Sequence, residues 1–364
     1  MVKGIGAVRL RSLLDAFGDA QSAWQAHPEE LRAAGLPAGI VENLIKLRAS
    51  VVLETIWDQI QAQGIQVIIW NDEQYPVRLR EIDQAPPVLY VRGVLDLQDE
   101  WAVAIVGTRR ITAYGRQVAE RIAVKLANSG ITVVSGLALG VDTVAHQATL
   151  DAGGRTLAVL GCGVDRLYPP RNRQLAERIL ESGALLSDYA PGTPPEASNF
   201  PPRNRIISGL SLATVVVEAS EKSGALITAD FAVEQGREVF AVPGSVFSPQ
   251  SRGPNRLIQN GAHPLLDPQE ILDILDLTRV AAQSEARIIL PANATEAQLF
   301  AILGHDPLHV DEIRAQSDLP IEQVTATLAL MELKGMVRQV GGMRYTVIRE
   351  SEAEYITKEE TDAQ

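Results

Sequence analysis

Two arginines follow a glycine directly after a stretch that we expect to be a buried strand. The run Gly107-Thr108-Arg109-Arg110 comes after the apolar residues 102–106 and shortly before a predicted helix. Glycine lets the backbone approach an anion, threonine offers a hydroxyl, and arginine presents a fork of donors that matches a phosphate. Free amides at the start of the next helix would add positive potential. The spacing predicts a phosphate-binding loop, and the plainer interpretation is a turn between a strand and a helix.

A second loop of small residues, Ser135-Gly136-Leu137-Ala138-Leu139-Gly140, is expected at the same edge. Its glycines permit close approach of the backbone to a ligand. Asp142 could cap the helix that follows, and His146, four residues later, could pair with Asp142. We interpret both side chains as structural, because no nucleophile stands near His146 for it to activate.

A third segment places an aromatic residue just before two closely spaced arginines. Phe200 precedes Arg203, Asn204 and Arg205. A site for single-stranded nucleic acid needs aromatic rings on which bases stack and cations that follow the backbone. The alternative is that Phe200 packs in the core while Arg205 makes an internal ion pair.

A fourth segment, Glu218-Ala219-Ser220-Glu221-Lys222-Ser223-Gly224, links a predicted strand to a predicted helix. Lys222 and Ser223 are placed to hold a phosphate at the start of that helix. Glu218 and Glu221 count against a strongly basic pocket, so we expect any phosphate site here to be local.

Strands and helices must position these segments, and their patterns alternate between residues 102 and 242. Strands are expected at 102–106, 131–134, 156–160, 184–186, 213–218 and 239–242, and helices at 114–128, 141–151, 171–181 and 225–235. Continuous apolar strands that alternate with helices predict a parallel sheet covered on both faces, and right-handed crossovers make it doubly wound. Ligands of such Rossmann-like sheets bind beyond the carboxyl ends of the strands. The loops that begin at Gly107, Ser135, Gly161 and Glu218 lie at that edge.

Five segments are expected along this α/β chain. They are a small helical domain (1–65), the Rossmann-like domain (66–276), a linker (277–293), a winged helix of three helices and a hairpin turned at Gly341-Gly342 (294–349), and an acidic disordered tail (350–364). Gly4-Ile5-Gly6 is similar to the start of a helix-hairpin-helix or SAM-like element, or it is simply a glycine-rich helix start. The helical pattern begins abruptly, which leaves open a missing helix upstream.

The net charge of −12 at first argues against nucleic acid, but the distribution of charge matters more. Lys plus Arg against Asp plus Glu number 9 and 14 in residues 1–100 (−5), 16 and 13 in 101–265 (+3), and 8 and 18 in 266–364 (−10). In the middle segment 14 of the 16 cations are arginine, which suits planar contacts to phosphate. Charge alone supports a neutral domain with solvated arginines about equally well.

The numbers of cysteines and histidines exclude several further classes of protein. The single cysteine, Cys162, excludes a disulfide framework and a cysteine-rich zinc site, and the 5 scattered histidines do not suggest a metal cluster. No apolar run approaches the roughly 20 residues of a membrane span, and Met1 leads straight into a charged helical pattern without a signal peptide. We therefore expect a cytoplasmic protein without a metal or another cofactor.

Together the four segments resemble the DNA-processing protein A family, also called Smf. The resemblance rests on these runs: Val106-Gly107-Thr108-Arg109 with Tyr114-Gly115, residues 135–142 with Ala145-His146, Phe200 with residues 203–211, residues 222–229, Gly236-Arg237, and Ala241-Val242-Pro243-Gly244. It is densest over residues 65–275, and the helical start and the winged-helix end agree with the longer family members.

The resemblance implies a non-enzymatic role in natural transformation and homologous recombination. Such proteins bind incoming single-stranded DNA without strong sequence preference, protect it, and load a RecA-type recombinase. They pair as homodimers through the C-terminal part of the Rossmann-like domain, here around residues 255–262 with Leu257 and Ile258. No catalytic residue is implied.

The match of motifs also assigns roles in DNA binding. Phosphate contacts are implied for Gly107, Thr108, Arg109, Arg205 and Lys222, and base contacts for Phe200 and Asn204. With the neighbouring Ser135, Gly136, Arg203 and Ser223, these residues form our predicted DNA-binding set. One departure concerns the expected recognition helix, 321–334, which carries Glu322, Glu332 and only Lys334. A helix that reads duplex DNA should offer several cations, so we expect the winged helix to contact protein or to regulate.

Two other functions compete with this interpretation. Rossmann-like proteins similar to lysine-decarboxylase-like phosphoribohydrolases cleave nucleotides with the motif Pro-Gly-Gly-x-Gly-Thr-x-x-Glu, but residues 222–229 lack its double glycine and its catalytic glutamate. A ligand-sensing transcription regulator would use the winged helix to read DNA, which the acidic recognition helix disfavours. The sequence favours a nicotinamide dehydrogenase even less, because no Gly-x-Gly-x-x-Gly follows the first strand and no ribose-binding acid stands about 20 residues later.

Overall fold

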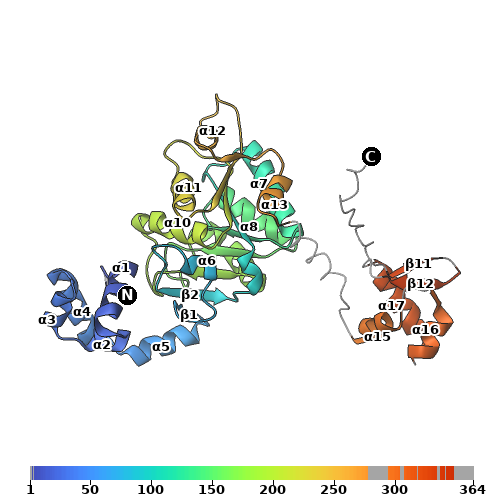
Figure 1. Ribbon diagram of the computed structural model, residues 1–364, viewed down its shortest axis with the longest axis horizontal. Helices are drawn as coiled ribbons and strands as arrows, with labels where there is room; N and C mark the ends of the chain where they lie inside the picture. Colours follow the sequence, from blue (N-terminus) through green and yellow to red (C-terminus); the bar gives the residue numbers. More distant parts are fainter. Residues whose placement is uncertain are drawn as a thin grey trace, which may run out of the picture. The chain divides into compact units, whose positions relative to one another are not determined.

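The computed structural model describes residues 2, 4–277, 294–303, 307–317, 319–333, 337–340 and 342–347 (Figure 1). The chain divides into two compact units, Met1–Ala281 and Ala282–Gln364. Of the expected linker, only Leu277 is described, and it is buried against the sheet of the first unit. Lys334, Gly341 and the expected tail at 350–364 lie outside the described residues.

Helices occupy the start of the first unit, as the apolar pattern predicted. They are α1 (Ala7–Phe17), α2 (Ala20–Gln25), α3 (Pro28–Ala33), α4 (Ala38–Ser50) and α5 (Leu53–Ala62). Polar residues begin two of them: the Asp19 carboxylate accepts from the Ser22 amide, and His27 and Glu30 form a capping box around α3. Apolar side chains of α1 to α4 meet in a small core of their own: Leu13, Ala23, Leu31, Val41 and Leu44.

One sheet of nine strands organises the rest of this unit. The strands are β1 (Gln66–Ile69), β2 (Val88–Gly93), β3 (Ala102–Val106), β4 (Thr132–Ser135), β5 (Thr156–Val159), β6 (Ala184–Ser187), β7 (Ala213–Val216), β8 (Glu238–Ala241) and β9 (His263–Pro264). Their order across the sheet is β1-β2-β6-β5-β4-β3-β7-β8-β9. In this order, the seven neighbouring strands that begin with β6 and end with β9 all pair in parallel. Strands β1 and β2 extend the sheet beyond β6 with antiparallel pairing.

Two layers of helices cover this sheet, which explains why its strands are apolar on both sides. One face packs against α6 (Val77–Arg80), α10 (Phe200–Gly209) and α11 (Gly224–Glu234). The other packs against α7 (Ala113–Asn128), α8 (Val141–Asp151), α9 (Arg173–Ser182) and α13 (Gln269–Ile274). Along β3, Ala102, Ala104 and Val106 point to the first face, and Val103 and Ile105 point to the second. The predicted doubly wound, Rossmann-like α/β fold is confirmed.

The strand order reverses at β3, and this reversal positions the site. From β3 the chain continues through β4, β5 and β6 on one side, and it then returns to place β7, β8 and β9 on the other. Val106 at the end of β3 pairs with Val216 at the end of β7. The connections that leave these two ends diverge to opposite faces, which opens a crevice at the carboxyl edge.

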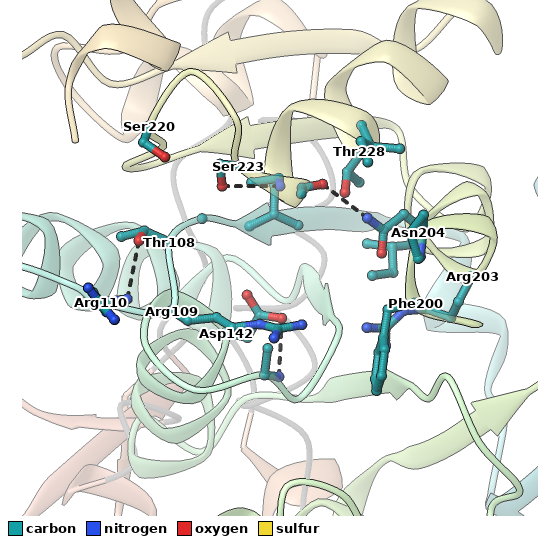
Figure 2. A pocket seen from close by; sticks show the side chains of 18 of the residues that line it. Thr108, Arg109, Arg110, Asp142, Phe200, Arg203, Asn204, Ser220, Ser223 and Thr228 are labelled. Carbon is teal, nitrogen blue, oxygen red and sulfur yellow. Dashed lines mark hydrogen bonds between the residues drawn. The ribbon is translucent and has the colours of Figure 1, made fainter. Parts of the chain in front are cut away.

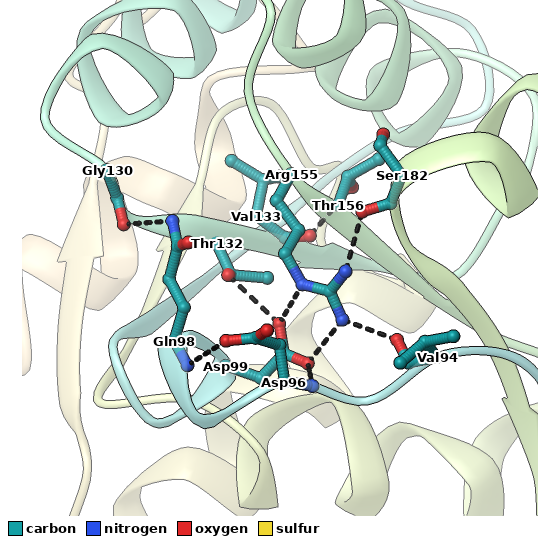
Figure 3. Close-up of polar contacts among 10 residues, drawn as sticks. All are labelled: Val94, Asp96, Gln98, Asp99, Gly130, Thr132, Val133, Arg155, Thr156 and Ser182. Carbon is teal, nitrogen blue, oxygen red and sulfur yellow. Dashed lines mark hydrogen bonds and ion pairs between the residues drawn. The ribbon is translucent and has the colours of Figure 1, made fainter. Parts of the chain in front are cut away.

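The amino edge of the same sheet is closed by one ion pair (Figure 3). Arg155, in the turn before β5, contacts both carboxylate oxygens of Asp99 at 2.6 and 2.7 Å. Its remaining donors bond the carbonyls of Val94 and Ser182 at 2.5 and 2.6 Å. Asp99 belongs to the short 3-10 helix η1 (Leu97–Glu100), so the pair ties the β2–β3 connection to β5 and to the end of α9.

The second unit has the elements of a winged helix. Its helices are α15 (Ala294–Ile302), α16 (Val310–Ser317) and α17 (Ile321–Leu333), and its strands are β10 (Leu308–His309), β11 (Val337–Gln339) and β12 (Arg344–Val347), in the order β10-β12-β11. Leu299, Ile313, Val324, Leu328 and Met331 form its core. The predicted winged helix is confirmed, and β10 is a third strand that the sequence pattern did not indicate.

Three elements of the first unit differ from the predicted ones. The segment that holds Phe200 and the arginines is a helix, α10, which we had not assigned. The helix expected at 171–181 begins instead with the 3-10 helix η2 (Pro170–Asn172), and α12 (Arg252–Gln259) falls in a stretch without an assignment. In the part of the chain that the structure describes, no helix is long and apolar enough to cross a membrane.

Candidate functional site

A cavity of about 710 Å³ lies at the carboxyl edge, between the loops that follow β3 and β7 (Figure 2). Figure 2 shows side chains from the β3 loop, from α10 and from the start of α11 facing one hollow. Seven of the eleven residues of the predicted DNA-binding set line it: Gly107, Thr108, Arg109, Phe200, Arg203, Asn204 and Ser223. The fold thus brings together three segments that are far apart in the sequence.

The loop after β3 supplies two arginines that are free for a ligand. The side chains of Arg109 and Arg110 are exposed, and within the described residues neither guanidinium makes a hydrogen bond or an ion pair. The Thr108 hydroxyl accepts a hydrogen bond from the Arg110 amide at 3.1 Å, which shapes the loop. A side chain at Gly107 would collide with Val141 and with the Glu218 carbonyl, so glycine is required for this close approach.

Glu218 holds the β3 and β7 loops together and does not face the ligand. Its side chain is 2% exposed. The Glu218 carbonyl accepts from the Thr108 amide at 2.7 Å, and its carboxylate accepts from the amide and hydroxyl of Thr112 at 3.0 and 2.5 Å. The carboxylate also fills the space where a side chain at Gly115 would stand, which explains the Tyr114-Gly115 pair. The negative charge of Glu218, which we expected to make a phosphate site here less basic, is therefore buried and bonded to Thr112.

The start of the second loop is buried beneath the cavity, whereas Ala138 lines it. The Ser135 hydroxyl donates to the Ile105 carbonyl at 2.6 Å, and the Gly136 amide donates to the Asp142 carboxylate at 3.0 Å. Neither Ser135 nor Gly136 lines the cavity, whereas Asp142 does. Burial raises the pKa of Asp142. The nearby Arg203 charge and the amides that donate to the Asp142 carboxylate oppose that change.

Two details expected for this loop are wrong, although both side chains are structural. Asp142 does not cap α8, because Gly140 is the capping residue and no side chain bonds there. His146 does not pair with Asp142, and its Nδ1 lies 2.7 Å from the Thr156 hydroxyl. The Asp142 carboxylate instead accepts hydrogen bonds from the amides of Gly136 and Ala138.

Helix α10 places its functional side chains on one face. Phe200, Arg203, Asn204 and Ile207 follow the i, i+3, i+4, i+7 spacing and all line the cavity. Arg203 is only 4% exposed and donates to the carbonyls of Gly136 and Val159, so it joins the ends of β4 and β5. Burial lowers the pKa of Arg203 to about 10, opposed by the Asp142 carboxylate.

The opposite face of the same helix carries Arg205. Its guanidinium pairs with Asp188 at 2.8 Å, and both side chains are largely buried. Arg205 does not line the cavity. The internal ion pair that we had weighed as the alternative for Arg205 is thus present in the structure.

The start of α11 completes the cavity. Ser223 caps this helix by accepting from the Ala225 amide at 3.3 Å, and Gly224 leaves the first turn open. The Asn204 side chain donates to the Gly224 carbonyl at 3.1 Å, which fixes α10 against α11. Lys222 is exposed and lies outside the cavity lining.

Several residues outside the predicted DNA-binding set also line the cavity: Arg110, Asp142, Tyr168, Ser220, Thr228 and Gln250. Arg110 belongs to the predicted phosphate-binding loop and Asp142 was interpreted as structural, whereas Tyr168, Thr228 and Gln250 were missed by sequence reasoning. Tyr168 comes from the loop after β5, and its ring centroid lies 5.8 Å from that of Phe200. The signal that could have found Tyr168 is its position after Gly161, in one of the loops that we expected at the carboxyl edge.

The described lining of the cavity contains no histidine, cysteine or lysine. Asp142 is the one carboxylate among the described lining residues, and the amides of Gly136 and Ala138 both donate to its Oδ2 atom. The described residues contain no group of three or more histidines, cysteines or carboxylates that could hold a metal ion. What the cavity offers is free guanidinium groups, a helix start and aromatic rings, a combination suited to phosphates and bases.

Comparison with known proteins identifies the family. The family described as DNA recombination-mediator protein A matches residues 66–276, and the family described as DprA winged helix domain matches residues 283–343. The chain is 38% identical to Protein Smf of Synechocystis sp. over 94% of its length and 96% of that protein. It is 36% identical to Protein Smf of Escherichia coli over 92% of its length and 93% of that protein.

Two solved structures agree with this assignment. The first is DNA processing protein A of Streptococcus pneumoniae, with a TM-score of 0.67 and 34% identity over 75% of this chain and 94% of that one. The second is DNA processing protein A of Helicobacter pylori, whose title concerns its binding of single-stranded DNA, with a TM-score of 0.53 and 31% identity over 58% of this chain and 95% of that one. With its Rossmann-like domain, its winged helix and relatives that match nearly its whole length, this chain belongs to the DNA recombination-mediator protein A family, also named DprA or Smf.

Proposed function

We propose that this protein binds single-stranded DNA in the carboxyl-edge cavity and hands the strand to a RecA-type recombinase. The observation that carries the DNA-binding part is the unpaired guanidinium of Arg109, which faces a cavity with an aromatic wall. The H. pylori relative, whose title names single-stranded DNA binding, supports the choice of ligand.

The geometry suggests how a strand is held. Arg109 and Arg110 face phosphates from the β3 loop, and the first turn of α11 offers the Gly224 amide and the Ser223 hydroxyl to another phosphate. Gly107 keeps the backbone close to the ligand. None of these contacts reads a base, so binding depends little on sequence.

The remaining members of the predicted set take different roles in this proposal. Ser135, Gly136 and Arg203 are buried and support the cavity from below. Lys222 is an exposed cation beside the start of α11, and it contacts a phosphate only where the strand leaves the cavity. Arg205 contacts DNA only if it gives up Asp188, so we rank it last.

We further propose that the protein is a cytoplasmic recombination mediator and not an enzyme. We also propose that it forms a homodimer through α12, where Leu257 and Ile258 are half-buried. The edge strand β9 pairs with β8 and with no other described strand, so it adjoins a surface that a second copy can cover. Size-exclusion chromatography with light scattering tests this: Ile258→Glu should give monomers, and a wild-type monomer contradicts it.

The experiment that tests DNA binding is titration of a fluorescent strand of about 20 nucleotides across a salt series. Arg109→Ala should weaken binding about tenfold or more and reduce the magnitude of the log-log salt slope by about 0.7, the value for one phosphate contact on a single strand. The matched control is Arg178→Ala, which removes an arginine from the surface pair with Asp151, away from the cavity.

Three outcomes decide between the functions. Equal losses in both variants, or no preference for a single strand over a duplex, would contradict the proposed site. Release of base from a nucleoside monophosphate would instead indicate the phosphoribohydrolase. A footprint at one operator sequence would indicate the transcription regulator.

A further inference from the structure

We propose that Tyr168, and not Phe200, is the ring on which a base of the bound strand stacks, and that this ring makes the cavity select unpaired bases. The proposal rests on the proposed function, because it places single-stranded DNA in the cavity. It assigns to Tyr168 a role that the sequence motifs did not indicate.

Phe200 already has neighbours around its ring. A side chain added to Gly161 would stand 2.8 to 3.3 Å from three of its ring atoms, so the ring lies directly against that glycine. The guanidinium carbons of Arg109 and Arg203 each lie 5.7 Å from the ring centroid. Tyr168 is its fourth neighbour. Phe200 is half-buried and less open than Tyr168, and these contacts suit a residue that holds Arg109, Arg203 and Tyr168 in place.

Tyr168 is in the opposite situation. It lines the cavity, it is 42% exposed, and its ring meets Phe200 at a tilt of 42°. Within the described residues its hydroxyl makes no hydrogen bond. Tyr168 therefore adds an open aromatic surface to the cavity lining, supported from behind by Phe200.

The loop that carries Tyr168 is fixed on both sides. Asn172, four residues later, donates to the carbonyls of Leu137 and Ala138 and contacts the Thr143 hydroxyl. Before it, the Asp165 carboxylate accepts from the Gly192 amide at 2.9 Å. A ring held in advance loses little conformational entropy when a base covers it.

Such a ring discriminates between single and double strands. A base can stack on Tyr168 only after it has left the stack of its own helix, which costs a duplex several base-pair contacts. The guanidinium groups of Arg109 and Arg110 attract phosphates of either form. Selectivity for the single strand then comes from the tyrosine, and affinity comes mainly from the arginines.

The test compares two single-stranded DNA ligands of 20 nucleotides with the same charge: oligo(dT) and a strand of abasic deoxyribose phosphates. Tyr168→Leu should weaken binding of oligo(dT) about tenfold and leave binding of the abasic strand unchanged, because stacking is lost only where bases exist. Tyr168→Phe should bind both strands as the wild type does. Phe200→Leu should weaken both strands by the same factor, because it displaces Arg109.

The outcomes separate this inference from the proposed function. A loss on both strands for Tyr168→Leu, or no loss on either, or a loss for Phe200→Leu that requires bases, overturns the role of Tyr168. If Arg109→Ala still weakens both strands in that case, DNA binding in the cavity stands and only the stacking residue is wrong. If the wild type binds neither strand, the proposed function itself fails. Thermal melting of each variant confirms that it is folded.

Discussion

Arg155 and Arg109 lie at opposite edges of the same sheet and have opposite environments. At the amino edge the Arg155 side chain is 14% exposed, and its guanidinium is bonded to Asp99 and two carbonyls (Figure 3). At the carboxyl edge the Arg109 side chain is exposed and makes no ion pair among the described residues (Figure 2). The donors of Arg155 are used by the fold, whereas those of Arg109 remain available to a ligand.

The difference shows why a count of arginines does not locate a binding site. The Rossmann-like domain owes its local positive charge to arginine, yet Arg155, Arg203 and Arg205 are all occupied by protein groups. Position at the carboxyl edge is not sufficient either, since Arg203 lines the cavity and still serves the scaffold. A free guanidinium at the switch point of the strand order is the informative combination.

The largest predicted effect is on stability, at the amino edge. Arg155→Met should lower the free energy of unfolding by about 3 kcal/mol, because it leaves Asp99 as a mostly buried charge without its partner. For a domain of this size that corresponds to a melting temperature lower by about 8 °C. Differential scanning calorimetry measures it, with Arg178→Met, from a surface ion pair, as the control that should change by less than 1 kcal/mol. Equal shifts would mean that the amino-edge pair is not special.

The second prediction concerns a buried histidine between the two edges. The Thr156 hydroxyl donates to the Val133 carbonyl, so His146 must donate to it through Nδ1, and its Nε2 is buried without a partner. Burial lowers the pKa of His146 to about 3 from its usual 6.5. Between these values only the unfolded chain binds the proton, so stability should fall as the pH drops below 6.5 and stop falling near 3.

Chemical denaturation at several pH values measures this effect. From pH 7 to pH 5 His146 should cost about 2 kcal/mol of stability. The control is His146→Gln, in which the dependence on pH should be weaker by that amount, while Asp142 and Asp188 continue to titrate in both proteins. Parallel curves for wild type and variant would show that His146 is protonated in the folded state.

The third prediction returns to the carboxyl edge and to a charge that serves the fold there. Glu218→Gln should lower stability by about 1 to 2 kcal/mol, because hydrogen bonds from Thr112 to a carboxylate are stronger than those to an amide. Binding of single-stranded DNA should not weaken, since a negative charge is removed. Glu221→Gln, on the same loop but exposed, is the control and should leave stability unchanged. Weaker DNA binding by Glu218→Gln at a temperature where it is folded would give the carboxylate a direct role.

The sheet was predictable because its signals are local and repeated. The strand at 102–106 and the helix at 141–151 have the bounds expected from their apolar patterns. Helix α10 was missed because Pro201 and Pro202 are typical of a break, although proline fits the first turn of a helix, where no amide partner is needed. With α10 unassigned, Arg203 and Arg205 could not be separated onto opposite faces.

Tertiary contacts explain what else escaped prediction. Tyr168 reaches the cavity because Asn172 anchors its loop to the Leu137 carbonyl, a contact between segments 35 residues apart. No periodicity reports such a contact. The β3 and β7 loops of the cavity were predictable for the opposite reason, since each directly follows a predicted strand, and the segment of Phe200 was found from its aromatic residue beside two arginines.

The smallest predicted change in stability is at Arg109, and it completes the comparison with Arg155. Arg109→Ala should alter the free energy of unfolding by no more than about 0.5 kcal/mol, because the exposed guanidinium makes no hydrogen bond or ion pair with a described group and loses only its contact with the Phe200 ring. The reciprocal measurement is the salt slope for single-stranded DNA, which should keep its wild-type value in Arg155→Met at a temperature where that variant is folded. A destabilised Arg109→Ala, or an altered slope in Arg155→Met, would show that the two edges are coupled. Unchanged stability in Arg109→Ala and an unchanged salt slope in Arg155→Met would show that Arg155 stabilises the sheet and Arg109 binds DNA independently of each other.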